Sequence, residues 1–204
     1  TKENAGAVSL FVNDTTRIST YRKTTHIFGN TTYKDYLSNN YINLTFDKKF
    51  FLSTNKQYVE KFIQFEKKNN SDLIEVHNRA HYIKIIKKKY NNKLFLYFHN
   101  DPKTMRGSKS ILEREKILEK CAAIFCVSKY IRKQFLDGIK INHSKVHILH
   151  NGVDRKINKL PVKKKEVLFV GRLVLEKGVD LYIDAVSAAA KMFSDWDFGL
   201  IGSS

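Results

Sequence analysis

Short apolar runs that alternate with amphipathic helical patterns constrain the fold of this chain more than any other feature. Four runs have the length of buried strands: 72–76, 94–98, 123–127 and 146–149. The segments between them carry apolar residues at helical spacing, over 80–90, 110–120 and 129–137. Short buried strands that alternate with helices predict an α/β fold, with a parallel sheet that helices cover on both faces.

Similar patterns continue toward both ends of the chain. Residues 7–22 and 55–68 have helical spacing, and 25–28 is a short apolar run before Gly29. A later series predicts a second strand–helix–strand unit, with its elements at 167–170, 180–193 and 198–201.

A polar segment with a proline, 159–165, separates the two series, as a linker would. We therefore expect two domains. Residues 1–160 form one Rossmann-like domain without its first strand, and 161–204 form the opening strand–helix–strand unit of a second, truncated one. A two-stranded sheet buries little surface, so we expect the chain to be cut at both ends.

The charge is strongly positive, with 37 Lys plus Arg against 20 Asp plus Glu, which gives 37 − 20 = +17. Phosphate backbones attract such chains, but phosphate-binding proteins favour the planar fork of arginine. Lysines number 29 and arginines only 8, so most of the charge follows from composition and no nucleic-acid partner is expected. A basic binding module for nucleic acid or anionic lipid stays open as an alternative.

One basic stretch, 82–90, mixes Lys84, Lys87, Lys88 and Lys89 with apolar residues at near-helical spacing. Such a helix could lie on an anionic membrane surface. A solvated helix with one buried apolar stripe is the alternative, and we favour it.

The longest apolar run, 121–127, is far too short for a membrane-spanning helix, which needs about 20 residues. The first residues lack the apolar core of an export signal. Two cysteines, Cys121 and Cys126, cannot form a disulfide scaffold. We expect a cytoplasmic protein, with peripheral contact at the inner face of the cytoplasmic membrane as an extension of that location.

Polar residues follow three of the predicted strands, where a parallel sheet opens onto a ligand crevice. The strand ends carry His77, Asn78 and Arg79, then His99 with Asn100, then His150 with Asn151 and Gly152. Three such ends predict a pocket. No metal site is expected, because no pair of these residues has the spacing of metal ligands.

The second unit opens with Gly171 and Arg172 directly after a strand, followed by Lys177 and Gly178. The glycine lets the backbone approach a ligand closely, and the two cations suit a diphosphate leaving group whose charge grows as the bond breaks. A surface loop with an incidental Arg and Lys is the alternative. The chain has no P-loop, no GxGxxG and no GxSxG, so ATPase, dinucleotide and esterase chemistry have little support.

These residues resemble the motifs of family 4 glycosyltransferases. Gly171-Arg172 followed by Glu176-Lys177-Gly178 resembles the hallmark of that family, and 150–154 resembles the segment before it. Four further segments resemble its N-terminal domain in the same order: 4–9, 72–79, 97–102 and 124–131.

The resemblance implies a GT-B fold, with two Rossmann-like domains facing across a cleft. It also implies retaining transfer of a sugar from a nucleotide-sugar donor to a glycan or lipid-linked acceptor, in cell-envelope polysaccharide or lipopolysaccharide biosynthesis. No cofactor or bound metal is expected. The implied roles are donor diphosphate binding by Gly171, Arg172 and Lys177, catalysis by His99 near the transferred sugar, acceptor-side contacts by Gly6, His77, Asn78 and Arg79, and a hinge at Asn151 and Gly152.

The family also carries two glutamates, spaced E-x7-E, later in the second domain, and no residue of this chain can be given their roles. We therefore expect these 204 residues alone to bind donor weakly and to turn over little. Other GT-B enzymes, such as a phosphorylase or a nucleotide-sugar epimerase, are alternatives within the same fold.

Overall fold

The computed structural model describes residues 5–46, 53–141, 143–153, 157–159 and 161–203. Asn4 and Asp154, two residues of the resembling segments, lie outside these ranges. The chain divides into two compact units, Thr1–Val153 and Asp154–Ser204. Whether they correspond to the two domains of a larger enzyme stays a prediction.

The first unit contains five α-helices and six strands among its described residues, with one 3₁₀ helix, η1 (Pro102–Thr104). The helices are α1 (Ala7–Ile18), α2 (Thr54–Asn69), α3 (Ala80–Lys87), α4 (Ile111–Lys120) and α5 (Lys129–Leu136). The strands are β1 (Ile27–Gly29), β2 (Tyr41–Asn43), β3 (Leu73–His77), β4 (Lys93–Phe98), β5 (Ala123–Cys126) and β6 (Val146–Ile148).

Serine caps set where three of these helices begin. The hydroxyls of Ser53, Ser110 and Ser128 each accept a hydrogen bond from a backbone N–H in the first turn of α2, α4 and α5, respectively. Such a cap satisfies one of the donors that a helix start leaves unpaired. At α4 the Glu113 side chain also accepts from the Ser110 backbone, completing a capping box.

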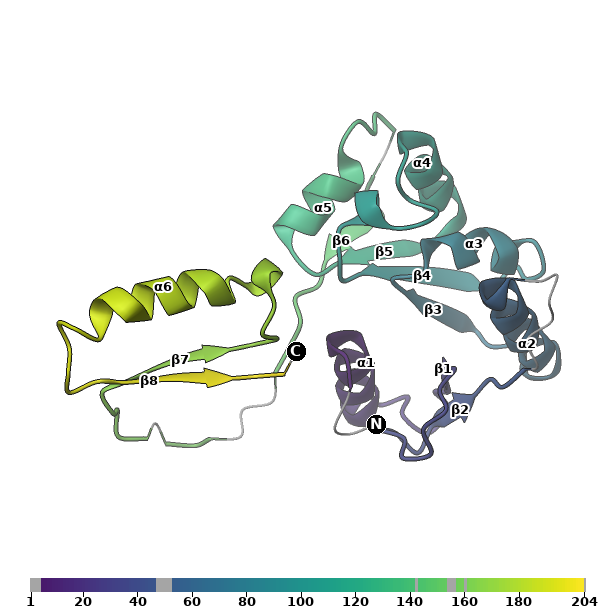
Figure 1. Ribbon diagram of the computed structural model, residues 1–204. Coiled ribbons are helices and arrows are strands. Elements are labelled where there is room, and N and C mark those ends of the chain that lie inside the picture. The colour runs from purple at the N-terminus through teal and green to yellow at the C-terminus, as the bar shows by residue number, and fades with distance from the viewer. Residues whose placement is uncertain (1–4, 47–52, 142, 154–156, 160, 204) are drawn as a thin grey trace. The chain divides into compact units, whose positions relative to one another are not determined.

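Strands β3, β4, β5 and β6 form one sheet in that order, and every neighbouring pair is parallel. Helices α3, α4 and α5 cross over between successive strands (Figure 1). The predicted α/β class and parallel sheet are confirmed, and the unit has a Rossmann-like architecture. Its carboxyl edge therefore gathers the residues that follow each strand.

Side chains alternate between the two faces of this sheet. One face packs under α3, α4 and α5 and contributes Val76, Leu96, Phe98, Ile124 and Cys126 to the buried core. The opposite face carries Phe95, Tyr97 and Phe125: the Phe125 ring stacks on Tyr97 and meets Phe95 edge-on across β4 and β5. Strand β3 alternates between buried residues and residues that are exposed or partly exposed. Helix α1 contacts this second face through the Phe11 ring, and Tyr97 is buried there, so coverage of this face by helices stays a prediction.

The N-terminal region differs from the prediction in two places. Helix α1 ends at Ile18 instead of residue 22, because Ser19 is extended and its hydroxyl accepts from the Tyr21 N–H. Such local bonds compete with helical ones. Strand β2 was not predicted, because three residues beside an Asn pair show no alternation; it pairs in parallel with β1 in a separate two-stranded sheet.

Helix α3 resolves the two interpretations of the basic stretch. Its apolar residues Tyr82, Ile83 and Ile86 are buried in the core, so this helix cannot present them to a membrane. Lys84, Lys88 and Lys89 remain exposed. Among the described residues no helix is long and apolar enough to cross a membrane.

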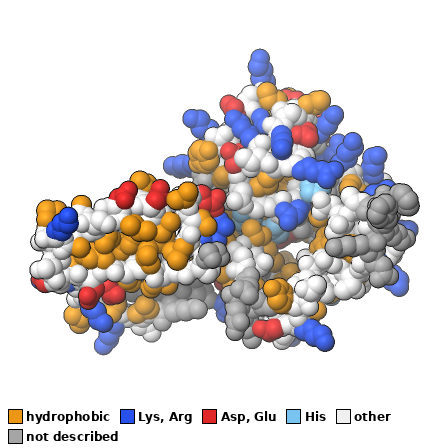
Figure 2. Space-filling view, in the orientation of Figure 1, with side chains coloured by type: hydrophobic (Ala, Val, Ile, Leu, Met, Phe, Trp, Pro, Cys, Tyr) orange, Lys and Arg blue, Asp and Glu red, His pale blue; other side chains and the backbone are white. Residues whose placement is uncertain are grey.

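The second unit consists of β7 (Glu166–Val170), the 3₁₀ helix η2 (Leu175–Lys177), α6 (Val179–Ala189) and β8 (Asp197–Ile201). Strands β7 and β8 are parallel and α6 connects them. The Tyr182 hydroxyl lies 2.9 Å from the carbonyls of both Val167 and Gly199, and so ties the helix to both strands. Figure 2 shows a broad hydrophobic surface on this unit. Leu181 and Ile183 of α6 are among the exposed hydrophobic residues of the unit.

A buried arginine joins α4 to α5. Arg114 is 2% exposed, and its guanidinium donates to the backbone carbonyls of Phe135, Lys109 and Asp137 at 2.8, 2.8 and 2.6 Å, with a longer bond to Ser108 at 3.3 Å. These carbonyls come from the loop before α4 and from the end of α5. One side chain, that of Arg114, therefore links these two segments through hydrogen bonds.

Replacing Arg114 with alanine should destabilise the first unit strongly. The change leaves a cavity and buried carbonyls without donors, so the free energy of unfolding should fall by about 3–5 kcal/mol. Denaturant unfolding followed by circular dichroism measures it. Lys116→Ala, an exposed position on the same helix, is the matched control and should change stability by no more than about 0.5 kcal/mol. Equal effects of the two variants would refute a structural role for Arg114.

Candidate active site

Asn78 fastens the ends of β3 and β4 to each other at the carboxyl edge of the sheet. Its φ is 53°, a left-handed conformation that asparagine tolerates better than most residues. Its backbone N–H donates to the Tyr97 carbonyl at 2.9 Å, and its side-chain oxygen accepts from the His99 N–H at 2.8 Å. Its side-chain amide donates to Asn100 Oδ1 at 2.7 Å. The backbone position of His99 is therefore fixed from the neighbouring strand.

The imidazoles of His77 and His99 form a direct pair. His77 Nδ1 lies 3.1 Å from His99 Nε2, so one ring donates and the other accepts. On its other side His77 Nε2 lies 3.7 Å from Glu75 Oε2. The structure thus brings together His77, Asn78 and His99, three of the residues that the sequence placed at strand ends.

Aromatic rings enclose this pair. The Phe11 ring of α1 meets the His99 ring edge-on, with 5.0 Å between the ring centroids. The Tyr97 ring stacks on the His77 ring, with 4.5 Å between the centroids. The Tyr97 hydroxyl donates to Glu75 Oε1 at 3.3 Å, and burial, followed by the nearby Glu75 charge, raises the Tyr97 pKa. The sequence analysis missed Phe11 and Tyr97. Tyr97 could have been predicted beside His77 once β3 and β4 were known to be neighbours, because their parallel register pairs these two residues.

Desolvation, reinforced by His77, lowers the pKa of His99 to about 4. His99 is therefore neutral near pH 7 and can accept a hydrogen bond through a ring nitrogen. A neutral imidazole suits contact with a hydroxyl group better than contact with a phosphate.

The remaining predicted acceptor-side residues lie at the starts of α1 and α3. Gly6 caps α1, and a Cβ at that position would meet nothing within 4 Å, so the surface there is open. Phe11 follows five residues later and contacts the His pair. Arg79 caps α3 and donates to the Asn78 carbonyl at 3.3 Å. Their acceptor-side roles stay predictions.

The end of β6 is more open than the ends of β3 and β4. His150 Nδ1 lies 3.0 Å from the Val127 carbonyl, at the end of neighbouring β5. Asn151 and Gly152 are exposed, and a Cβ at Gly152 would meet nothing within 4 Å. The division between the two units follows directly after Val153. A hinge at Asn151 and Gly152 stays a prediction.

The predicted diphosphate residues share one loop of the second unit. Gly171 follows β7 and donates its N–H to the Ile201 carbonyl at 3.0 Å. Arg172 forms an exposed ion pair with Glu176, and Lys177 ends η2, just before Gly178 begins α6 in a left-handed conformation. Arg172, Lys177 and the N-terminus of α6 therefore lie within one short segment, which suits an anion.

Among the described residues no group of three or more His, Cys, Asp or Glu side chains could hold a metal ion. Burial raises the pKa of Cys121 and of Cys126 to about 12, so neither thiol is reactive near neutral pH. Both belong to the core under the helices.

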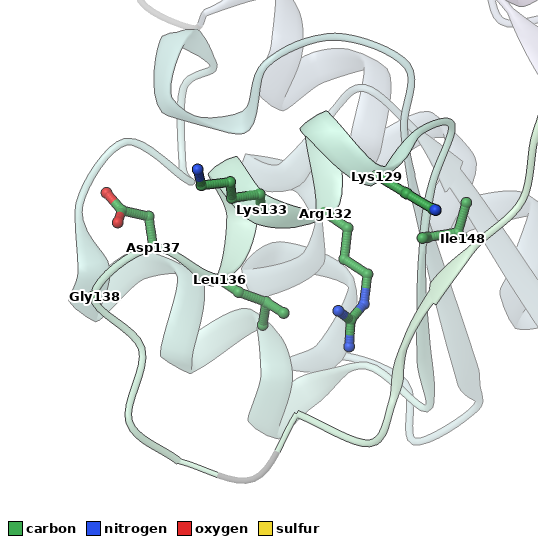
Figure 3. A pocket seen from close by; sticks show the side chains of 7 residues that line it. All are labelled: Lys129, Arg132, Lys133, Leu136, Asp137, Gly138 and Ile148. Carbon is green, nitrogen blue, oxygen red and sulfur yellow. The ribbon is translucent and has the colours of Figure 1, made fainter.

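A separate, shallow pocket of about 600 Å³ lies along α5 and contains none of the predicted site residues. Its lining residues include Lys129, Arg132 and Lys133 (Figure 3). The three cations leave α5 in different directions, and Lys133 lies on the side of Asp137 (Figure 3). Arg132 Nε already donates to the Val146 carbonyl at 3.1 Å. The pocket does not focus its charge on one point.

Comparisons with known proteins agree with the motifs. The family model Glycosyltransferase Family 4 matches residues 35–156. An uncharacterized glycosyltransferase of Methanocaldococcus jannaschii is 38% identical over 79 residues, which are 39% of this chain and 20% of that protein. The match thus spans about a fifth of that relative's length. A crystal structure of accessory secretory proteins 1, 2 and 3 of Streptococcus pneumoniae aligns with a TM-score of 0.45 and 11% identity, covering 73% of this chain and 36% of that one. It is too distant to inform the site.

The pKa of His99 makes a prediction about stability and pH. The unfolded histidine has a pKa near 6.5 and the folded one a pKa of about 4. Between these values only the unfolded chain binds the proton, so the free energy of unfolding should fall as the pH falls from 6.5 to 4. One histidine contributes a slope of at most about 1.4 kcal/mol per pH unit, and less here because His99 is only partly buried.

His99→Asn should make that pH dependence shallower, as urea unfolding at a series of pH values between 7 and 4 would show. His81, whose ring nitrogens are buried without a partner and whose pKa burial also lowers, should keep part of the slope in both proteins. His143→Asn removes an exposed histidine of the same unit and serves as the control. An unchanged slope in His99→Asn would contradict the burial of a neutral His99.

Proposed function

Because the chain belongs to glycosyltransferase family 4, we propose that it transfers a sugar from a nucleotide-sugar donor to a glycan or lipid-linked acceptor, with retention of the anomeric configuration. The observation that carries the donor part of this proposal is the loop after β7, where Arg172 and Lys177 stand at the start of α6. The α/β architecture of both units agrees with the expected GT-B fold.

The loop is suited to a diphosphate for two physical reasons. Unpaired N–H groups and the helix dipole give the N-terminus of α6 a partial positive charge. Arg172 and Lys177 add two positive charges within six residues of sequence, and Glu176 offsets the charge of Arg172 until a ligand replaces it. Negative charge that develops on a nucleoside diphosphate leaving group would be stabilised there without a metal ion.

The His pair is suited to the neutral part of such a substrate. His99 is neutral near pH 7 and is held in place by Asn78. We propose that His99 contacts the transferred sugar, and that Gly6, His77, Asn78 and Arg79 form the acceptor side. Hydroxyl groups are the recognition elements that sugars present, and a neutral imidazole can bind them without the cost of burying a charge.

The acceptor is proposed to belong to cell-envelope polysaccharide or lipopolysaccharide biosynthesis. A lipid-linked acceptor would bring the protein to an anionic membrane surface. The exposed Lys84, Lys88 and Lys89 could contribute there as charges only, because the apolar side of α3 is buried. Figure 2 shows Lys and Arg side chains spread over the visible face of the first unit, not gathered in one stripe.

Arg172→Ala tests the donor proposal. Sugar transfer by the full-length protein, assayed with a panel of nucleotide sugars, should fall about 10²–10³-fold in kcat/KM because a cation at the leaving group is lost. Lys191→Ala, which removes an exposed cation of the same unit, should leave transfer unchanged. Equal activity in Arg172→Ala and the native protein would refute the role of this loop. Tight salt-dependent binding to nucleic acid without sugar transfer would favour a basic binding module instead.

Glu176→Gln should strengthen donor binding. Glu176 forms an ion pair with the Arg172 guanidinium, so a diphosphate that binds Arg172 must first displace the Glu176 carboxylate. An exposed ion pair is worth about 0–1 kcal/mol, so affinity for UDP, GDP or ADP should rise by up to about fivefold in isothermal titration calorimetry. Asp184→Asn removes the same charge from the exposed side of α6 and controls for long-range effects. Weaker binding in Glu176→Gln alone would mean that Glu176 orients Arg172 for the ligand.

A further inference from the structure

Glu75, His77 and His99 form a continuous chain of contacts across the ends of β3 and β4. Glu75 Oε2 lies 3.7 Å from His77 Nε2, and His77 Nδ1 lies 3.1 Å from His99 Nε2. Glu75 and His77 share one face of β3 because strand residues two apart point the same way. The parallel register places His77 beside Tyr97, two residues before His99.

The Glu75 carboxylate determines which ring nitrogens of His77 and His99 carry their protons. A neutral imidazole carries one N–H, and a carboxylate only accepts hydrogen bonds. An N–H on His77 Nε2 is therefore attracted to Glu75, whereas a lone pair there would face a negative charge. With the proton on Nε2, His77 Nδ1 is an acceptor, and the 3.1 Å contact then requires His99 Nε2 to be the donor.

We propose that Glu75 is a positioning residue that acts through His77 to hold His99 in its Nε2–H form, leaving His99 Nδ1 as an acceptor for a hydroxyl of the transferred sugar. The sugar part of this inference rests on the proposed function. The proton arrangement rests only on the geometry of the three side chains.

Two further observations support the acceptor role. Within the described part of the chain, His99 makes its hydrogen bonds through Nε2 and its backbone N–H, and none through Nδ1. The fully buried side-chain atoms without a partner in that part are the ring nitrogens of His81, so His99 Nδ1 is not fully buried and keeps access to solvent or ligand. The low pKa of His99 keeps the ring neutral near pH 7, so this nitrogen retains its lone pair. The Tyr97 hydroxyl and Phe11 enclose the chain, and Tyr97 donates to Glu75, which holds the carboxylate in place.

The tautomers can be measured directly in the substrate-free protein. Two-bond 1H–15N correlation spectra of 15N-histidine-labelled protein at pH 8 distinguish protonated from unprotonated ring nitrogens, and His77→Asn and His99→Asn assign the signals. The expected pattern is a protonated Nε2 on both rings and an unprotonated Nδ1 on both. A protonated Nδ1 on His99, or a doubly protonated His77, would overturn the proposal.

Glu75→Leu separates this role from a general structural one. Losing a contact to a charged group should shift the ratio of His99 tautomers roughly tenfold toward the Nδ1–H form. Glu75→Gln keeps an acceptor oxygen and should restore the native pattern, and Glu119→Leu, an exposed glutamate of α4, should leave it unchanged. An unchanged His99 ratio in Glu75→Leu, with a native backbone spectrum, would refute control by Glu75.

Substrate titrations identify the source of the hydroxyl independently of the tautomers. A shift of His99 Nδ1 with a nucleotide sugar, absent with the nucleoside diphosphate alone, supports the transferred sugar as the donor of this bond. A shift only with the acceptor glycan would overturn that assignment. Absence of sugar transfer together with the expected tautomers would refute the proposed function but not the proton arrangement. Sugar transfer together with reversed tautomers would support the proposed function and refute the proton arrangement.

Discussion

The bond network of Asn78 is the interaction on which the candidate site depends. Parallel pairing of β3 and β4 brings their carboxyl ends to one edge, but pairing alone leaves the following residues free to diverge. Asn78 prevents this through three hydrogen bonds to residues at the end of β4, and it does so in a backbone conformation that few other side chains tolerate. The 3.1 Å contact between His77 and His99 follows from that attachment.

The core explains why this edge can carry polar groups at all. The helix-covered face holds the buried apolar cluster, to which all four strands contribute, so the stability of the first unit does not require the opposite face to be fully buried. That second face is free to carry Glu75, His77 and Tyr97, which are partly buried or packed against one another. Aromatic stacking provides a low-dielectric setting for the histidines, and this setting lowers the pKa of His99.

Much of the fold could be predicted from hydrophobic patterns, and the rest depended on contacts between distant residues. The four main strands followed from apolar runs of 4–8 residues, the length of buried strands, and the helices between them followed from apolar residues at helical spacing. Strand β2 had no such run, and the end of α1 was set by one serine hydroxyl. His77, Asn78 and His99 could be placed at strand ends, but their mutual bonds depend on register. The sequence carries no signal that Arg114 is buried, because the carbonyls that accept from it belong to the loop before α4 and to the end of α5.

The two units offer different electrostatic settings, and the proposed function would use each of them for a different chemical group. In the first unit, the ionisable groups at the strand ends are arranged so that His99 stays neutral, which suits hydroxyl groups. In the second, Arg172 and Lys177 are exposed, and Glu176 pairs with Arg172. An exposed pair costs little to break, so the Glu176 carboxylate would be displaced readily by the proposed diphosphate, which carries more charge. The net charge of +17 alone would not separate these settings, because it counts lysines that are spread over the surface. The distinction arises from which charges are paired, which are buried, and which groups remain neutral.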